Sequence, residues 1–461
     1  MKQVILFLIS FLLNSLVFSQ TKLPNIIATN TTLTKANSPY SIENGMTINA
    51  GATLTIEAGV VVKIAQYKDI TVNGNLIVLG TKDDSVYFSD LTSGNPWGMI
   101  NSNEANIKLY YLVNEGSNRF LSATGGDTII ISHCRIFSTA TAGNGLDCIA
   151  AHDSKRVTID SILLTGSGGT IAGGSKNDAI DLDAVDSCFI FNNTVSHFSD
   201  DAVDIGTQTK YADIENNILS YTNFGVTVGE QSVAWLYKNI SIGNDGGIQS
   251  HNGAIVSGSN NILYSNTDGI ECYHSEEGET VQSGGIIHLT NTIFYQNHRS
   301  DITRQSSSTV DITYCLSDKD TINGDYNLKG DPKFVDPANG DFHIQFDSPC
   351  INNGKPDISG NPTTIGVFDY TGPIEVNQVI DLSEPFIIYP NPCKDFFQIG
   401  TTITEGKIQV ILSDLSGQIV KSCLISNKAA SIDVHALPAG MYFVTIIYSN
   451  TKIGSVKIIK E

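Results

Sequence analysis

The chain has 461 residues, of which 47 are acidic and 27 are basic, so its formal net charge is −20 at pH 7. This charge excludes nucleic acids and anionic lipid surfaces as direct partners unless a cation intervenes, and it makes calcium or another hard cation the first partner to consider. The length alone would allow about three ordinary domains. An internal repeat, described below, overrides that expectation because a solenoid grows by adding coils.

Residues 1–20 have the pattern of an export signal. Lys2 precedes an apolar run from Val4 to Leu13, and small residues follow up to Gln20. No second apolar run is long enough to span a membrane. We therefore expect an exported protein without a transmembrane segment in its mature part.

The chain contains eight cysteines, which lie far apart and form no CxxC pair. This spacing favours small buried apolar side chains over a disulfide framework. Disulfides remain open as an alternative, and their pairing cannot be assigned from the sequence.

A repeat organises the centre of the chain. Five short segments, each alternating small or polar with apolar residues, begin at residues 179, 202, 225, 247 and 269, so their starts are 22 or 23 residues apart. Alternation with period two is typical of a strand with one buried face. Two strand-forming columns per repeat, with Gly and Asn turns between them, leave no room for a helix. The pattern predicts a parallel β-solenoid that rises about 4.8 Å per coil.

Asparagines recur on the same interval, each shortly before a Val or Ile: Asn193, Asn217, Asn239 and Asn261. We interpret this column as a hydrogen-bonded ladder at a repeated turn, because stacked amides satisfy one another. Sugar recognition by these amides is the alternative.

The alternation begins earlier, at Gly51 to Ile64, and is followed by Pro96-Trp97-Gly98-Met99-Ile100. This segment resembles the opening rungs of exported right-handed β-helix proteins, which implies a cover for the first open edge. The segments Gly330 to Pro337 and Gly340 to Ile344 resemble the part that follows the last coil in β-helix proteins of surface and secreted type. That resemblance implies a capping role for residues 325–370.

Residues 371–385 are expected to form a linker. After Tyr389-Pro390-Asn391-Pro392, short alternating strands separated by turns predict a small β-sandwich. Together with Asp414-Leu415-Ser416-Gly417 and the run from Leu437 to Val444, this segment closely resembles the type IX secretion system sorting domain of type A. The resemblance covers residues 386–461. It implies the secretion machinery as a partner, and release or attachment at the outer cell surface.

An acidic cluster is the main candidate site. In the repeat, Ile180 and Val203 face inward, so Asp181 and Asp204 face outward one rung apart. Crowded carboxylates repel one another unless a proton or a cation lies between them, and a hard cation prefers oxygen ligands. The sequence therefore predicts a calcium site, with a solvated acidic turn as the alternative. The expected ligands are Asp178, Asp181, Asp200, Asp201 and Asp204.

The run Asp200-Asp201-Ala202-Val203-Asp204 resembles the calcium sites of pectate-lyase-like polysaccharide lyases. The resemblance implies that calcium binds a uronate carboxylate while an unprotonated Lys or Arg removes the neighbouring ring proton. Here the outward columns of the next rungs carry no Lys or Arg, and Lys210 and Lys238 lie elsewhere. This departure puts the lyase chemistry in doubt.

Other polar residues fall on the same side as the acidic cluster. A hydrolase with paired carboxylates is a further possibility. The catalytic candidates are Asp204, Asp181, His251 and Lys210. The substrate-binding candidates are Glu230, Gln249, Glu271, Tyr273 and His274. A solvated ladder with ring stacking is the alternative interpretation of these residues.

The sequence thus predicts an all-β chain: a right-handed parallel β-helix over residues 21–370, the linker, and the C-terminal β-sandwich. We expect a monomer that binds an extracellular acidic polysaccharide, with cleavage left open. The rival hypothesis is a non-catalytic surface or adhesion protein whose β-helix is a rigid spacer. The sequence leaves open which polysaccharide is bound and whether the sorting domain is removed.

Overall fold

The computed structural model shows two compact units built almost entirely of β-strands. The described residues are 20–138, 147–167, 177–274, 283–319, 322–368, 387–389, 393–400, 408–413, 419–425, 429–448 and 451–460. The first unit lies within residues 1–369, and the second consists mainly of residues 370–461. Residues 1–19 of the expected export signal and the whole expected linker fall outside the described residues.

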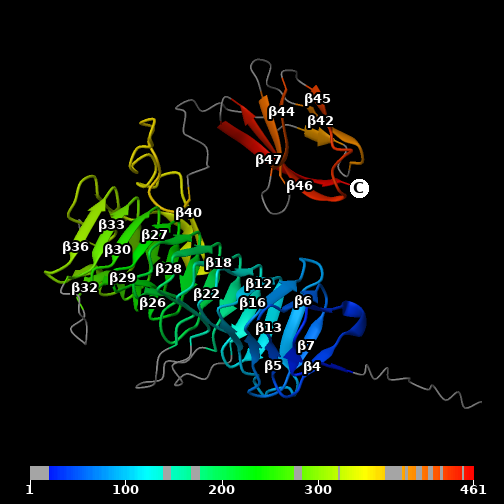
Figure 1. The fold of residues 1–461 in the computed structure, drawn as a ribbon. Helices are drawn as coiled ribbons and strands as arrows, with labels where there is room; N and C mark the ends of the chain where they lie inside the picture. The colour runs from blue at the N-terminus through cyan, green and yellow to red at the C-terminus, as the bar shows by residue number, and fades with distance from the viewer. Residues whose placement is uncertain are drawn as a thin grey trace, which may run out of the picture. The chain divides into compact units, whose positions relative to one another are not determined.

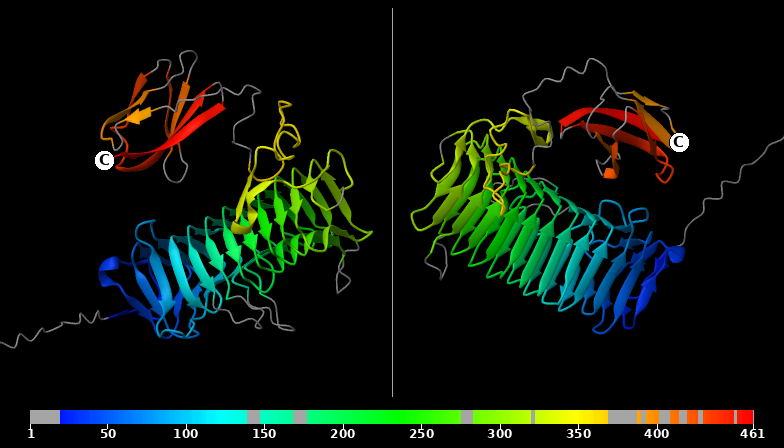
Figure 2. Two further views of the ribbon diagram at one scale, coloured as in Figure 1. Left: turned by 180° about the vertical axis from the view of Figure 1, so that it is seen from behind. Right: turned by 90° about the horizontal axis from the view of Figure 1, so that it is seen from above.

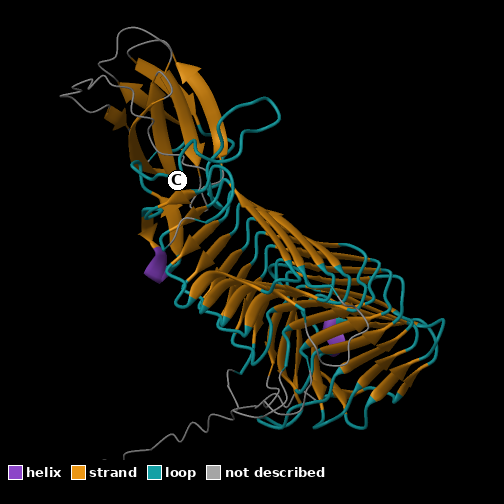
Figure 3. Ribbon diagram, turned by 90° about the vertical axis from the view of Figure 1, so that its left-hand side faces the viewer, coloured by secondary structure: helices purple, strands orange, loops and turns teal. Residues whose placement is uncertain are grey.

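Helical structure is limited, within the described ranges, to two 3₁₀ turns, η1 (Lys35–Asn37) and η2 (Pro337–Asn339). None of the helices described is long and apolar enough to cross a membrane. Strands dominate the view coloured by secondary structure (Figure 3).

The first unit is a solenoid in which a complete coil contributes one strand to each of three parallel sheets, named here A, B and C (Figure 1). The described residues supply 14 strands to sheet A and 12 each to sheets B and C. Figure 2 shows the strands of successive coils stacked along the solenoid in sequence order. The predicted right-handed parallel β-helix is confirmed.

The strands of sheet A are β1 (Thr21–Lys22), β4 (Tyr40–Ile42), β7 (Val61–Ile64), β10 (Val86–Asp90), β13 (Leu112–Ser117), β16 (Arg135–Ser138), β19 (Leu163–Thr165), β22 (Thr194–Ser196), β25 (Ile218–Ser220), β28 (Ile240–Ile242), β31 (Ile262–Tyr264), β34 (Ile293–Tyr295), β37 (Leu316–Ser317) and β38 (Leu328–Lys329). Those of sheet B are β2 (Ile26–Ile27), β5 (Met46–Ile48), β8 (Ile70–Val72), β11 (Ile100–Asn103), β14 (Leu121–Thr124), β17 (Ile149–His152), β20 (Ile180–Asp183), β23 (Val203–Gly206), β26 (Phe224–Val228), β29 (Gly246–His251), β32 (Asp268–Tyr273) and β35 (Ser300–Arg304).

The strands of sheet C are β3 (Thr31–Leu33), β6 (Thr53–Glu57), β9 (Asn75–Leu79), β12 (Asn106–Tyr110), β15 (Ile129–Ser132), β18 (Arg156–Asp160), β21 (Ser187–Phe191), β24 (Ala212–Glu215), β27 (Val233–Tyr237), β30 (Ile255–Ser259), β33 (Ile286–Thr290) and β36 (Thr309–Thr313). The sequence pattern had indicated two strand columns per repeat. The structure shows a third column, sheet C. The sequence pattern did not reveal it because the outward residues of sheet C differ in type from coil to coil.

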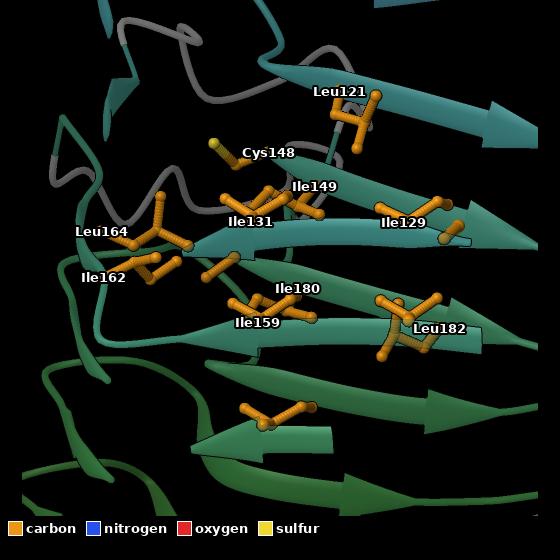
Figure 4. Close-up of a cluster of buried hydrophobic side chains, with 14 of the residues drawn as sticks. Leu121, Ile129, Ile131, Cys148, Ile149, Ile159, Ile162, Leu164, Ile180 and Leu182 are labelled. Carbon is orange, nitrogen blue, oxygen red and sulfur yellow. The ribbon is translucent and has the colours of Figure 1, made fainter. Parts of the chain in front are cut away.

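The solenoid core consists of inward-facing columns of aliphatic side chains. Val203, Val226, Ile248 and Ile270 pair in register on sheet B, and each is at most 2% exposed. Ile180 extends the column, next to Ile149 of the preceding coil (Figure 4). Burying such a side chain stabilises the fold by about 1.5–3 kcal/mol. The predicted stacked column is confirmed.

The asparagine column forms the predicted ladder. The Asn217 side chain accepts a hydrogen bond from the backbone N–H of Asn193 at 2.9 Å, and the Asn217 N–H donates to Asn239 Oδ1 at 3.1 Å. Asn239 bonds Asn261 in the same way. A second ladder at another corner of the coil, which the sequence analysis missed, consists of Asn244, Asn266 and Asn297. These bonds satisfy backbone groups that the buried turns would otherwise leave unpaired.

The segment after the last coil contacts the outer face of sheet A. Phe334 packs edge-on against Tyr295 with ring centroids 5.7 Å apart, and the backbone N–H of Gly366 donates to Asn291. The two short strands of this segment, β39 (Phe334–Asp336) and β40 (Asp341–Ile344), pair with each other. Its capping role stays a prediction.

The C-terminal unit contains two antiparallel sheets around its own core, which confirms the predicted β-sandwich. One sheet consists of β41 (Ile387–Tyr389), β42 (Phe396–Gly400) and β45 (Ala429–Asp433). The other consists of β44 (Ile419–Ile425), β43 (Ile408–Ser413), β46 (Gly440–Tyr448) and β47 (Thr451–Lys460). Seven of the eight cysteines are buried, and Cys423 is half-buried.

Replacing Asn217 by Ala should destabilise the solenoid, because the change leaves the buried N–H of Asn193 without its acceptor. Each such unpaired group costs about 1–3 kcal/mol. Urea denaturation followed by circular dichroism would measure the loss. As a control, Asn103→Ala removes an exposed amide and should change stability by at most about 0.5 kcal/mol. Equal midpoints for the two variants would contradict the structural role of the ladder.

Candidate functional site

A groove of about 650 Å³ crosses the outer face of sheet B over strands β23, β26, β29 and β32. Outward side chains in a parallel sheet stack one rung apart, so the groove is lined by columns of residues from successive coils. Its polar lining includes Asp200, Asp201, Asp204, Gln249, His251, Asp268, Glu271, Tyr273 and Arg299.

Three carboxylates converge at one end of this groove. Asp178, Asp201 and Asp204 each offer an oxygen atom within 4.8 Å of the others. Asp178 Oδ1 accepts the backbone N–H of Asp201 at 2.8 Å, and Asp201 Oδ1 accepts that of Phe224 at 2.9 Å. These bonds orient the carboxylates from coil to coil. We call Asp178, Asp201 and Asp204 the carboxylate trio.

Burial and mutual repulsion dominate the electrostatics of the trio. Burial, followed by the charges of Asp201 and neighbouring carboxylates, raises the pKa of Asp204 well above its usual value of 3.8. Burial and then Asp204 raise the pKa of Asp178 to about 11. At neutral pH Asp178 therefore holds a proton unless a cation replaces it, and the pKa of Asp204 is shifted in the same direction.

Arg119 and His152 lie beside acidic residues in and before the first coil of the trio. Arg119 lies 3.3 Å from Asp147. His152 lies 3.7 Å from Asp181 and 3.2 Å from Asp183, and its pKa is raised by the hydrogen bond to Asp183. Burial, followed by Asp183, raises the pKa of Asp181 to about 7.

Asp181 and Asp204 pair in register, as the repeat predicted. However, Asp181 joins His152 and Asp183 in a separate group of possible metal ligands. The five expected ligands are thus divided: three form the trio, Asp181 belongs to the second group, and Asp200 lines the groove while accepting a hydrogen bond from Asn223.

Arg299 brings a cation into the groove that the sequence analysis did not find. It lies in the turn before β35 and reaches back to the preceding coil, where Nε donates to Asp268 at 3.0 Å and an NH2 group lies 2.9 Å from Glu271. The hydrogen bond with Asp268 raises the pKa of Arg299, so this guanidinium stays charged. Asp268 continues the column of strand positions in which earlier acidic residues stand. The sequence period could not place Arg299, because it does not predict where the side chain of a turn residue points.

His251 and Tyr273 form a stacked pair over the groove. Their ring centroids are 5.5 Å apart and the planes are inclined by 23°. Gly229 makes room for the imidazole, since a Cβ there would lie 2.6 Å from a ring carbon of His251. Burial raises the pKa of the Tyr273 phenol, and burial with a hydrogen bond to Asp268 raises that of Glu271 to about 6. The predicted residues His251, Glu271 and Tyr273 thus share one surface.

Three other predicted residues are not part of the groove lining. The Lys210 ammonium group pairs with Asp186. Glu230 accepts the backbone N–H of Thr207 at 3.2 Å, and the backbone N–H of His274 donates to Gln305 at 3.0 Å. Their contacts are structural ones, so a catalytic role for Lys210 and binding roles for Glu230 and His274 stay predictions.

One buried polar group faces the groove without a partner. Thr227, in register with Asp204, is 4% exposed, and its hydroxyl makes no hydrogen bond to any residue the structure describes. An unpaired buried hydroxyl costs free energy that a bound ligand or water would recover. The site therefore combines oxygen ligands for a hard cation with polar groups along one wall.

Comparison with known proteins identifies the C-terminal unit. Residues 387–461 match the family described as "Secretion system C-terminal sorting domain". No curated protein matches the chain. The tail is therefore the sorting domain that its sequence resembles, and the protein is secreted by the type IX machinery.

Two solved structures were compared with the whole chain. An alginate lyase from Paenibacillus sp. str. FPU-7 aligns with 14% identity and a TM-score of 0.27, over 63% of this chain and 98% of the lyase. Full-length tailspike protein 2 from Escherichia coli O157:H7 bacteriophage CAB120 aligns with 11% identity and a TM-score of 0.24, over 96% of this chain and 64% of the tailspike.

Deleting residues 386–461 should stop secretion and leave the protein in the periplasm, with the β-helix still folded. The physical reason is that the described apolar cores of the two units share no residue. Cell fractionation would locate the truncated protein, and circular dichroism would report its folding. Normal release of the truncated chain would contradict the sorting role, and an unfolded product would contradict the independence of the cores.

Proposed function

We propose that this secreted β-helix protein binds an extracellular acidic polysaccharide in the groove on sheet B, through a calcium ion held by Asp178, Asp201 and Asp204. The observation that carries the proposal is the convergence of three carboxylates within 4.8 Å at the end of an open groove. Calcium takes six to eight oxygen ligands, so a site with three carboxylates keeps positions for a polymer carboxylate and water.

The choice of Asp at these positions supports a bound cation. Asp178 and Asp201 accept backbone N–H groups from the next coil, whereas the ladder asparagines accept N–H groups from the preceding coil. An asparagine would make the same bond without charge. Two carboxylates where amides would serve, with Asp204 beside them, weaken the cation-free protein through repulsion and desolvation, and a divalent cation reduces both costs.

The far end of the groove supports an anionic polymer. Glu271 lies three rungs from Asp204, about 14 Å away, and Arg299 is held beside it. A calcium ion at one end would attract a carboxylate of the polymer, and the Arg299 guanidinium at the other end offsets the charges of Asp268 and Glu271, which would otherwise repel the polymer.

The groove favours binding over cleavage. A lyase needs an unprotonated base near the substrate, but the raised pKa values of Arg299 and Tyr273 keep both groups protonated at neutral pH. His251 remains as the candidate base, and Asp204 as a candidate acid for a hydrolase. The rival function, a rigid surface spacer, requires neither a cation nor a ligand in the groove.

Calcium should raise the melting temperature of the metal-free protein, because it binds only the folded site. At a concentration 100 times Kd the stabilisation is about 2.7 kcal/mol. Asp201→Asn together with Asp204→Asn should abolish the rise, since the amides keep the corner hydrogen bonds but remove two charges. Differential scanning calorimetry would measure both proteins.

The matched control for this experiment is Asp83→Asn with Asp325→Asn, which removes two exposed carboxylates outside the groove. This variant should respond to calcium as the unmodified protein does. If the protein melts identically with and without millimolar calcium, and titration calorimetry shows no heat, the carboxylate trio is a solvated acidic face. That result would favour the spacer function.

Arg299→Ala should weaken binding of a uronate polymer by about tenfold, or about 1.4 kcal/mol, because it removes a charged hydrogen-bond donor. Lys210→Ala should leave binding unchanged, since Lys210 is a basic residue outside the groove lining. Affinity electrophoresis in gels containing the polymer would measure both. The temperature must be well below the melting point of Arg299→Ala, because this variant leaves the buried Asp268 unpaired.

Equal retardation of the two variants would exclude the groove as the binding site. The same polymers, incubated with the protein with and without calcium, would show cleavage as unsaturated or reducing ends. Binding without new ends is the expected result.

A further inference from the structure

A second surface, on the outer face of sheet C, carries aromatic rings that the solenoid does not need. The rings come from strands β21 and β27 and from the turn before β24, the strand that lies between them. We call this surface the aromatic platform, and it consists of Phe189, Phe191, Tyr211, Trp235 and Tyr237. The core below it is already complete, because the inward side chains of the same strands are buried.

The platform alternates rings with carboxylates. In one column Asp213 lies in register between Phe189 and Trp235. In the next column Glu215 takes the same place between Phe191 and Tyr237. Phe189 and Trp235 are two rungs apart, which is about 10 Å.

The rings are exposed yet held in place. Trp235 is 51% exposed, and Tyr211 and Tyr237 are each 38% exposed. Phe189 contacts Phe191 at 5.9 Å and Tyr211 at 6.1 Å between ring centroids, and the Arg156 guanidinium lies 4.5 Å over its ring. Exposed apolar area gathered in one place marks an interaction surface rather than chance.

The strands on either side do not continue the pattern. The corresponding outward positions are Thr158 and Asp160 on β18, and Ser257 and Ser259 on β30. The rings are therefore confined to three coils, which matches a short segment of an extended ligand.

We propose that the aromatic platform binds a neutral polysaccharide. The apolar C–H face of a sugar ring packs flat on an aromatic ring, and its hydroxyl groups can donate hydrogen bonds to the carboxylates between the rings. Asp213 and Glu215 repel an acidic polymer at the centre of the surface. Arg156 and Lys238 already lie over the rings of Phe189 and Tyr237.

This surface is independent of the groove. It belongs to sheet C, whereas the carboxylate trio and Arg299 belong to the sheet B side of the coil. Its charge pattern also selects a different ligand. Failure of the calcium site would therefore leave this proposal standing, and the reverse also holds.

Tryptophan fluorescence gives a direct test, because the chain has two tryptophans and Trp97 is fully buried. Trp235 alone should respond to a ligand on the platform. Titration with a soluble neutral β-glucan and a soluble mannan should change the emission in a saturable way with at least one of them, and should protect the protein from acrylamide quenching.

The change Trp235→Ala should lower the affinity for the glycan at least tenfold, as measured by retardation in gels that contain it. Tyr237→Ala should lower this affinity less. The control is Tyr87→Ala, which removes an equally exposed ring from β10 of sheet A and should bind normally. Asp201→Asn with Asp204→Asn should also bind the neutral glycan normally, which separates this surface from the groove.

Several outcomes would overturn the proposal. It fails if neither neutral glycan changes the fluorescence, or if Tyr87→Ala loses as much affinity as Trp235→Ala. It also fails if polygalacturonate or vesicles containing anionic lipid are the ligands that Trp235 detects. Concentration-dependent dimers that Trp235→Ala disperses would show that a second copy of the chain covers the surface.

Discussion

The fold depends on hydrogen bonds at the corners of the coil, where a side-chain oxygen of one coil accepts the backbone N–H of its neighbour. Strand ladders hold neighbouring coils together within each sheet, but a strand that slips by one residue exchanges its inner and outer faces. The corner bonds oppose this slip because each asparagine contacts one particular N–H group. The bond from Asn217 to Asn239 is 2.9 Å long between the side chains and repeats at the next coil. When the coils are in register at the corners, each outward side chain lies above the side chain at the same position of the neighbouring coil.

The candidate site uses a related corner ladder, in which the acceptors are charged and the hydrogen bonds run in the opposite direction. Asp147, Asp178 and Asp201 form a ladder of carboxylates in which each accepts an N–H from the following coil. The first of them is balanced by Arg119, while the last two approach Asp204. Side chains that hold neighbouring coils in register thus also provide candidate cation ligands. Because the carboxylate ladder stands just before strands of sheet B, the cluster lies at the edge of this sheet and at one end of the groove.

Much of the fold could be predicted because its signal is periodic. The buried column through Val203 and the first asparagine ladder follow from a constant interval of 22 or 23 residues. The second ladder escaped notice because its interval lengthens from 22 residues between Asn244 and Asn266 to 31 between Asn266 and Asn297. Arg299 was missed because it stands in a turn and reaches back to the previous coil, and turn side chains follow no period. The aromatic platform was missed because its rings occupy columns whose other members are polar.

The corner ladders also bear on how such a chain can change its length over evolution. Insertion of one residue within a strand would exchange the inner and outer faces of the rest of that strand, up to the next corner. Adding or removing one whole coil, from one ladder asparagine to the next, preserves the hydrogen bonds of the ladder. The coils that become neighbours have the same turn at this corner. The stack of strands therefore grows by whole coils, each of which adds one row of outward side chains, while a single coil tolerates a longer interval such as the 31 residues from Asn266 to Asn297. A groove or a platform of this kind can be extended without rebuilding what is already present.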